Sequence, residues 1–157
     1  MSIERARAYL ARIGLADRIM EFEESSATVE LAAVAVGCEP ARIAKTLSFR
    51  VGERVALVIF AGDARVSNQK FKAQFHTKPR MLAAADAEEL VGHAVGGVCP
   101  FGVNDGCDVY LDRSLRRFDE VYPAAGNSAS AVRLTCDELE RACTPCEWVD
   151  VSKLPGE

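Results

Sequence analysis

The sequence predicts a mixed α/β (α+β) fold, in which helices and strands alternate irregularly and several strands are joined as hairpins. Segments with apolar residues at helical spacing lie among short apolar or alternating segments typical of strands, without a strict strand–helix–strand order. The chain has 157 residues and is 49% hydrophobic, which is enough to fill one core. We therefore expect a single domain over residues 1–157.

The first sixty residues predict two helices followed by a hairpin. Gly14, Gly37 and Gly52 provide the stops and the turn between these elements. The predicted elements are a helix over 2–13, a short strand over 19–24, a helix over 28–37 with Ser26 or Thr28 as N-cap, one helical turn starting at Pro40, and a hairpin of strands within 43–60.

The remaining residues alternate short helices and strands. Two serine or threonine caps and two capping-box spacings mark the helix starts. The predicted elements are a helix opened by Ser67, a helix over 86–92 with a capping box of Asp86 and Glu89, a strand over 107–112, a helical turn over 113–119, two strands around a loop at 124–130, a helix with a capping box of Thr135 and Glu138, and a last strand over 147–152 with Trp148 in the core.

The segment "IAKTLSF" (43–49) places a lysine, Lys45, among apolar residues of a predicted core strand. The aliphatic part of such a side chain can pack along the strand while its ammonium group emerges at the end of the sheet. There it either meets the negative charge of a ligand or acts as an ordinary edge lysine that deters pairing with other sheets.

Charge and hydropathy limit the classes of protein. The net charge of −4 argues against a general nucleic-acid binder, and no run approaches the roughly 20 apolar residues of a membrane span. The charged N-terminus is no signal peptide, so we expect a soluble, cytoplasmic protein without membrane partners. Residues 64–82, the basic segment, contain five basic residues close enough to steer a polyanion: Arg65, Lys70, Lys72, Lys78 and Arg80.

Cysteine and histidine provide little chemistry in this sequence. Six scattered cysteines are expected to be reduced, and only "CTPC" (143–146) has a suggestive spacing, without the second pair that a structural zinc site needs. A thiol-redox or metal protein built on this segment stays an alternative. We expect His76 at the surface and His93 in a structural hydrogen bond, and we expect neither metal nor cofactor.

Two glycine-containing loops complete the candidate site. "GGVCPFG" (96–102) and "AAGNSAS" (124–130) can bring backbone N–H groups close to a ligand, where they can hold a carbonyl oxygen or an oxyanion. A lysine nearby supplies a point charge for a phosphate or carboxylate.

The order of these motifs resembles the YbaK/EbsC family, also called the prolyl-tRNA-synthetase-associated or aminoacyl-tRNA editing domain. The resemblance covers roughly residues 20–150 and rests on "P.RIAKTLSF", "LVIFAGD.RV", "GGVCPFG" and "VYLD.SL.RFD.VYPAAG.S.S". It implies a curved mixed sheet or partial barrel flanked by helices. It also implies a trans-editing deacylase that hydrolyses the ester of a mischarged tRNA, with the acceptor end of tRNA on the basic segment and prolyl-tRNA synthetase as a candidate partner.

The resemblance also assigns site residues. The family lysine matches Lys45, and Cys99 is the one cysteine near the site. Family members act without a side-chain nucleophile, so the attack comes from the substrate itself or from a water molecule. The matching catalytic positions are Lys45, Gly96, Gly97, Gly126 and Ser128. The expected substrate-binding residues are Val98, Pro100, Phe101 and Asn127.

The loop at 126–130 departs from part of the family pattern. Alanine-specific members often carry a histidine there, whereas this chain has "GNSAS". The resemblance therefore favours cysteinyl-tRNA(Pro), or a seryl or threonyl ester, as substrate. A noncatalytic RNA-binding or regulatory module of the same fold stays a further alternative.

Overall fold

A computed structural model describes residues 2–94 and 96–157, and its centre is the antiparallel hairpin of β2 (Ile43–Val51) and β3 (Arg54–Ala61). The helices are α1 (Ser2–Ala11), α2 (Val29–Val36), α3 (Asn68–Phe75), α4 (Ala84–Val91) and α5 (Cys136–Cys143), with 3-10 turns η1 (Ala16–Arg18), η2 (Pro40–Arg42) and η3 (Arg113–Arg117). The other strands are β1 (Ile19–Glu21), β4 (Arg65–Val66), β5 (Cys107–Asp112), β6 (Glu120–Pro123), β7 (Ser130–Val132), β8 (Leu134–Thr135), β9 (Cys146–Val149) and β10 (Ser152–Lys153).

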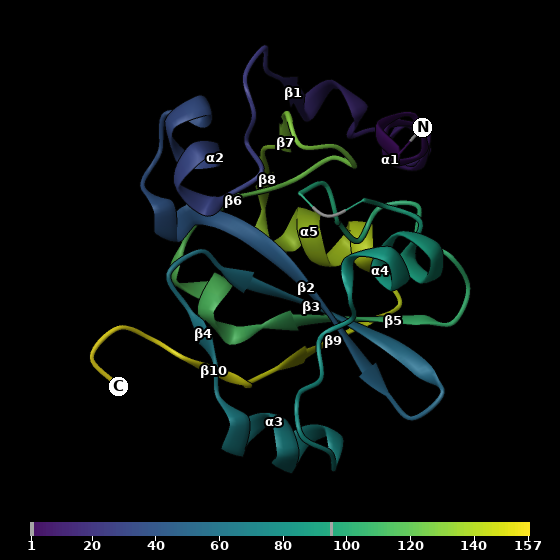
Figure 1. Ribbon diagram of the computed structural model, residues 1–157. Helices are drawn as coiled ribbons and strands as arrows, with labels where there is room; N and C mark the ends of the chain where they lie inside the picture. Colours follow the sequence, from purple (N-terminus) through teal and green to yellow (C-terminus); the bar gives the residue numbers. More distant parts are fainter. Residues whose placement is uncertain (1, 95) are drawn as a thin grey trace.

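Six strands form one curved mixed sheet in the order β8-β6-β2-β3-β5-β9 (Figure 1). β3 pairs in parallel with β5, and β5 with β9, while β2 pairs in parallel with β6 only at Ile43 and Ala44. Two small pairs, β1 with β7 and β10 with β4, lie outside this sheet. The mixed α/β class and the curved sheet with flanking helices are thus confirmed.

The two faces of the sheet carry different cores, because side chains alternate along each strand. Ile59 and Leu111 face a core completed by α1 and α5, whereas Val58 and Phe60 face α3. Figure 1 shows α3 on the lower side of the sheet and α1, α4 and α5 on the upper side. Phe71 of α3 is fully buried between the rings of Phe49 and Phe75.

Most of the predicted helix signals are confirmed. Thr28 caps α2, Ser67 caps α3, and Pro40 opens a helical turn. The capping box predicted for α4 is wrong, because the helix begins at Ala84 and therefore places Asp86 inside its first turn. Trp148 is only partly buried, and the Arg116 guanidinium lies 3.8 Å from its ring centroid.

The start of α5 provides a test of local stability. The Thr135 hydroxyl accepts a hydrogen bond from the Glu138 backbone N–H, and the Glu138 side chain accepts one from the Thr135 N–H. Thr135→Ala should lower the free energy of unfolding by about 1 kcal/mol, and Thr135→Ser should retain most of it. Urea melts of the three proteins check this; equal midpoints for the alanine variant and the wild type would contradict it.

Candidate active site

A cavity of about 250 Å³ opens where the start of α2, the middle of β2 and two loops converge. Its walls are mostly apolar, with a few polar groups from β2 and from the entry to α2. The lining includes Thr28, Val29, Lys45, Thr46, Leu82 and Val98.

One wall of the cavity is an unpaired stretch of strand edge. β6 covers this edge of β2 only as far as Ala44. Further along, the Leu82 N–H donates to the Ser48 carbonyl at 3.0 Å, and the Arg50 N–H donates to the Arg80 carbonyl at 2.9 Å. The edge at residues 45–47, which we call the edge gap, lies between these two covered stretches and faces the cavity.

The ammonium group of Lys45 lies in this wall, anchored by backbone carbonyls. Its Nζ donates to the Ala64 carbonyl at 2.6 Å and to the Gly62 carbonyl at 3.3 Å. Burial lowers the pKa of Lys45, and the nearby carboxylates of Asp63 and Glu30 partly oppose this shift. An ammonium group has three N–H donors, so one is left for a ligand.

The two glycine-containing loops come together at the rim. A Cβ atom at Gly97 would lie 2.5 Å from the backbone nitrogen of Asn127, so only glycine permits this contact. The entry to α2 joins them, because the Ser26 N–H donates to the Ser128 carbonyl at 2.6 Å. Lys45, Gly96 and Val98 line the cavity, while Ser128 lies close beside Gly96. Three of the sequence-predicted positions thus line the cavity, and Gly97, Asn127 and Ser128 lie beside them.

Other residues predicted for the site lie outside the cavity lining and make contacts within the protein. Phe101 is fully buried in the core, where its ring centroid lies 6.3 Å from that of Tyr9. It is not among the residues that line this cavity, and its role in substrate binding stays a prediction. Pro100 is buried on the far side of its loop, in a second hollow beside α1. Asn127 holds its own loop, since its Oδ1 accepts from the Ala129 N–H at 2.9 Å. Buried Gly126 adopts a φ of 99° there.

Cys99 has no base to activate it. Its Sγ lies 3.6 Å from His93 Nε2, but that nitrogen is 2.7 Å from the Phe101 carbonyl and therefore carries the proton. Burial raises the pKa of Cys99 to about 12. Burial also lowers the pKa of His93, partly opposed by the Phe101 carbonyl. His93 thus has the structural hydrogen bond expected from the sequence.

The "CTPC" segment offers no poised thiolate. Burial raises the pKa of both Cys143 and Cys146, and the neighbouring thiols and Glu140 add to this. All six cysteines are free, and no group of three metal-ligating side chains gathers anywhere in residues 2–94 and 96–157. Within the same ranges, no helix is long and apolar enough to cross a bilayer.

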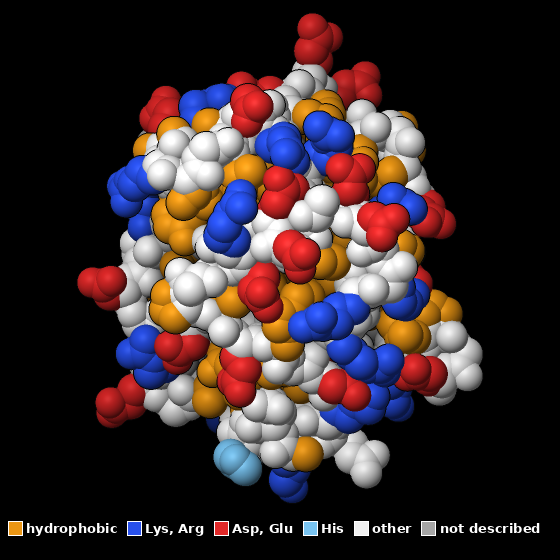
Figure 2. All heavy atoms as spheres, turned by 180° about the vertical axis from the view of Figure 1, so that it is seen from behind, with side chains coloured by type: hydrophobic (Ala, Val, Ile, Leu, Met, Phe, Trp, Pro, Cys, Tyr) orange, Lys and Arg blue, Asp and Glu red, His pale blue; other side chains and the backbone are white. Residues whose placement is uncertain are grey.

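Basic side chains on the reverse side of the molecule are interspersed with acidic ones (Figure 2). Four side chains of the basic segment are exposed to solvent and could contact a polyanion: Arg65, Lys72, Lys78 and Arg80. Lys72 and Lys78 line a shallow hollow together. Arg80 directly precedes Met81 and Leu82, which line the cavity, so the basic segment leads to the cavity rim.

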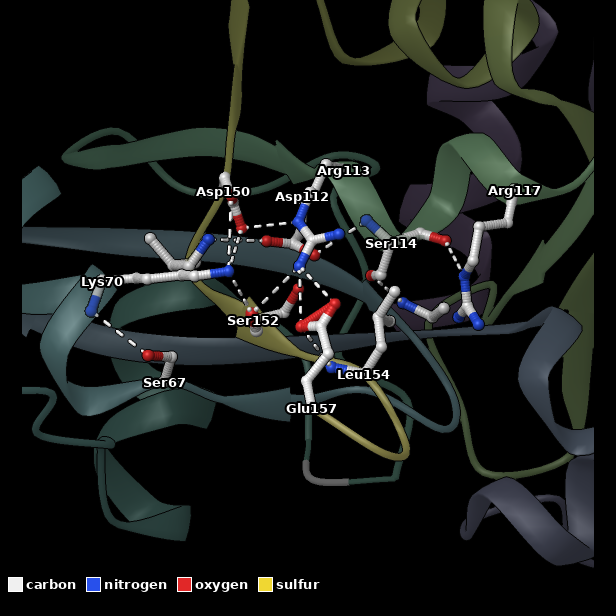
Figure 3. A network of polar contacts seen from close by, with 12 residues as sticks. Ser67, Lys70, Asp112, Arg113, Ser114, Arg117, Asp150, Ser152, Leu154 and Glu157 are labelled. Atoms are coloured by element: carbon white, nitrogen blue, oxygen red, sulfur yellow. Dashed lines mark hydrogen bonds and ion pairs between the residues drawn. The ribbon is translucent and has the colours of Figure 1, made fainter.

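Lys70 has a structural role that its position in the sequence did not reveal. Its Nζ donates to Asp150 at 3.1 Å and to the Ser152 carbonyl at 3.0 Å. Arg113 joins the network, pairing with Asp150 and Glu157 (Figure 3). Lys70 thus ties α3 to the C-terminal strands, and its charge is already balanced.

Thr46 is the residue of this site that sequence reasoning missed. It lines the cavity directly after Lys45, and its buried hydroxyl has no hydrogen-bond partner among the described residues. Threonine is common in β-strands, so the sequence gives no sign that Thr46 belongs to a site. The site becomes visible only from the structure, in which the neighbouring residues Ala44 and Ser48 are paired along this edge and Thr46 is not.

Within the described residues, the site is thus a small cavity at a strand edge, with an anchored lysine and without an activated cysteine. The family described as the aminoacyl-tRNA editing domain matches residues 23–142, and the chain belongs to this family.

Relatives agree with this assignment. The uncharacterized protein YwhH of Bacillus subtilis (strain 168) is 45% identical over 154 residues, which are 98% of each chain. A crystal structure of a candidate trans-editing enzyme for prolyl tRNA synthetase superimposes with a TM-score of 0.87 at 31% identity, covering 97% of both chains. The proline–tRNA ligase of Caldicellulosiruptor bescii is 29% identical over 90 residues, which are 57% of this chain and 15% of the ligase.

The surroundings of Cys99 predict an unreactive thiol. Because the thiolate is the reactive form, iodoacetamide at neutral pH should leave Cys99 unmodified in the native protein and alkylate it after denaturation. Peptide mass spectrometry measures both states. The half-buried Cys107 serves as an internal comparison, and rapid native alkylation of Cys99 would contradict its protonated, inaccessible state.

Proposed function

We propose that this protein is a trans-editing aminoacyl-tRNA deacylase, with residues 1–157 acting as one editing domain. The observation that carries the proposal is the meeting of Lys45, the edge gap and the two glycine-containing loops around one small cavity, in a chain of the aminoacyl-tRNA editing family. The substrate is a tRNA whose 3′ end carries a wrong, small amino acid.

The size of the cavity supports a small substrate. Pockets for drug-sized ligands usually measure about 300–1,000 Å³, and this cavity of about 250 Å³ lies below that range. A small aminoacyl group with its ester fits such a volume.

The chemistry needs no covalent intermediate. An aminoacyl ester is already activated, so position and stabilisation of the developing oxyanion are sufficient help. Water, assisted by the neighbouring ribose hydroxyl of the substrate, attacks the ester carbonyl; the amino acid leaves as a free acid and the tRNA regains its terminal hydroxyl. Lys45 contacts the terminal phosphate or the ester, and the backbone N–H groups of Gly96, Gly126 and Ser128 serve as donors to the carbonyl oxygen. Gly97 permits the close contact with Asn127, while its own N–H donates to the Ala94 carbonyl at 3.0 Å.

The loop at residues 126–130 and the relatives support a choice of substrate. The "GNSAS" loop lacks a histidine and favours cysteine, serine or threonine over alanine. The similarity to a proline–tRNA ligase segment and to a candidate trans-editing structure for prolyl tRNA synthetase supports tRNA(Pro) as carrier and the synthetase as partner. A noncatalytic RNA-binding module of the same fold would bind tRNA without releasing the amino acid.

A panel of mischarged tRNAs tests the activity and Lys45 together. The wild type should release a small amino acid from tRNA(Pro) and leave prolyl-tRNA(Pro) intact. Lys45→Ala should lose most of this activity, because the anchored cation is gone. Lys45→Arg should also be poor, since a planar guanidinium does not replace a compact ammonium.

Thermal melts provide the control for the Lys45 variants. Lys45→Ala loses the hydrogen bonds to the Gly62 and Ala64 carbonyls and should melt at a lower temperature than the wild type, but the protein should remain folded at the assay temperature. A Lys45→Ala protein that deacylates at the wild-type rate would show that Lys45 is an ordinary edge lysine. A wild type that binds tRNA but hydrolyses no ester in the panel would favour the noncatalytic alternative.

The exposed lysines of the basic segment should form part of the tRNA footprint. Lys72→Ala with Lys78→Ala should weaken tRNA binding and flatten its salt dependence, because fewer counterions are released. Stability should change by about 0.5 kcal/mol or less. The matched variant Lys70→Ala should instead lower stability, since Lys70 is held by Asp150. An unchanged salt slope in the double variant would locate the tRNA elsewhere.

A further inference from the structure

We propose that Thr46 reads the amino acid of the substrate. Its backbone N–H and C=O pair with the carbonyl and amino groups of the esterified amino acid, and its hydroxyl binds a hydroxyl or thiol on the substrate side chain. This inference rests on the proposed deacylase function and assigns a positioning and specificity role within the same cavity.

The direction of the Thr46 backbone groups follows from the pairing of β2. In an antiparallel hairpin, alternate residues point their N–H and C=O groups toward the partner strand or away from it. Ser48 and Arg50 point theirs away from β3, toward residues 80–82. Thr46 has the same parity and therefore points its groups toward the cavity. Among the described residues, no backbone hydrogen bond reaches Thr46 from this side.

The edge gap has the length of one amino acid. Pairing with β6 ends at Ala44, and pairing with residues 80–82 begins at Ser48. Among the described residues, the outward-pointing groups without a backbone partner are the N–H and C=O of Thr46 and, next to them, the N–H of Ser48. The N–H and C=O of Thr46 are the pair that one amino acid can bridge. An α-amino acid ester complements this pair, as in β-strand addition. The carbonyl of the ester accepts a hydrogen bond from the Thr46 N–H, and its amino group donates one to the Thr46 C=O. The Thr46 N–H would then also face the developing oxyanion.

The hydroxyl of Thr46 adds a preference for the side chain. Residues directly opposite in an antiparallel pair place their side chains on the same face of the sheet. The substrate side chain would therefore lie next to Thr46 Oγ1, which is buried and lacks a hydrogen-bond partner among the described residues. A serine, threonine or cysteine side chain supplies that partner, whereas an apolar side chain of the same size leaves the hydroxyl unpaired.

Paired substrates and two variants test the role of the side chain. Wild-type protein is compared with Thr46→Val and Thr46→Ser on one tRNA charged with serine or alanine, with threonine or valine, and with cysteine or α-aminobutyrate. Thr46→Val should lower the ratio of kcat/KM for the polar member of a pair to that for the apolar member by about tenfold to a hundredfold. Thr46→Ser should restore the discrimination.

The role of the backbone is tested with unmodified protein, so that folding is not in question. Replacing the α-amino group of the substrate by hydrogen, as in 3-hydroxypropionyl-tRNA compared with seryl-tRNA, removes the donor to the Thr46 carbonyl. Relative to the uncatalysed rates of the two esters, this change should slow deacylation by wild type at least about tenfold. Equal relative rates for the two substrates would overturn pairing with the edge. Unchanged discrimination in Thr46→Val, or a wild type that prefers alanine to serine, would overturn the side-chain role.

These outcomes differ from failure of the deacylase itself. If wild type releases no amino acid from any mischarged tRNA, both the proposed function and this inference fall. If wild type is active but Thr46→Val keeps the wild-type ratio of rates, the proposed function stands and the assignment of Thr46 is wrong.

Discussion

The incomplete pairing of β2 is the constraint on which the site depends. β3 is covered on both edges and is buried along nearly its whole length, so it cannot present backbone groups to a ligand. β2 shares that central position, but its outer edge is covered only at its two ends. Exposed strand edges usually invite pairing with other chains. Here the exposed part of the edge lies inside a cavity, whose walls keep other strands away and leave room only for a short, narrow ligand.

Lys45 depends on the same geometry. The turn at residues 62–64 supplies the carbonyls that hold its ammonium group. Gly62 is packed so closely on Pro40 and Val29 that a Cβ atom would collide with them, which fixes the turn against α2. The partly buried ammonium is therefore hydrogen-bonded without being neutralised by a carboxylate in direct contact. Such a cation interacts more strongly with an arriving phosphate or ester than an exposed lysine would.

Local sequence signals explain how much of the fold could be predicted. The caps at Thr28, Ser67 and Thr135 and the turn at Gly52 each involve residues within a few positions of one another, and each prediction is confirmed. The partners of β6 and β7 could not be predicted, because β7 pairs with β1, more than a hundred residues earlier. The start of α4 was misplaced because Ala83 gives no side-chain cap.

The site was predictable only where residue type limits the alternatives. A lysine in an apolar strand is unusual, and two adjacent glycines allow another backbone to approach closely; Lys45, Gly96 and Gly97 do converge with the loop at Gly126. Phe101 and Lys70 show the opposite case, since an aromatic ring and a lysine suit both a site and a structural role. Only their surroundings, the Tyr9 ring and Asp150, distinguish these roles. Thr46 belongs to this second group.

The most direct measurement of the central claim is an NMR titration with a non-hydrolysable aminoacyl-adenosine analogue, in which an amide replaces the ester. If the edge gap binds the aminoacyl group, the Thr46 backbone N–H resonance should shift strongly downfield as it gains a hydrogen-bond acceptor. Resonances at Gly96, Gly97 and Ser128 should move with the same dissociation constant, and those of α3 should stay unchanged. Saturating binding that leaves the Thr46 N–H resonance unmoved would contradict the account.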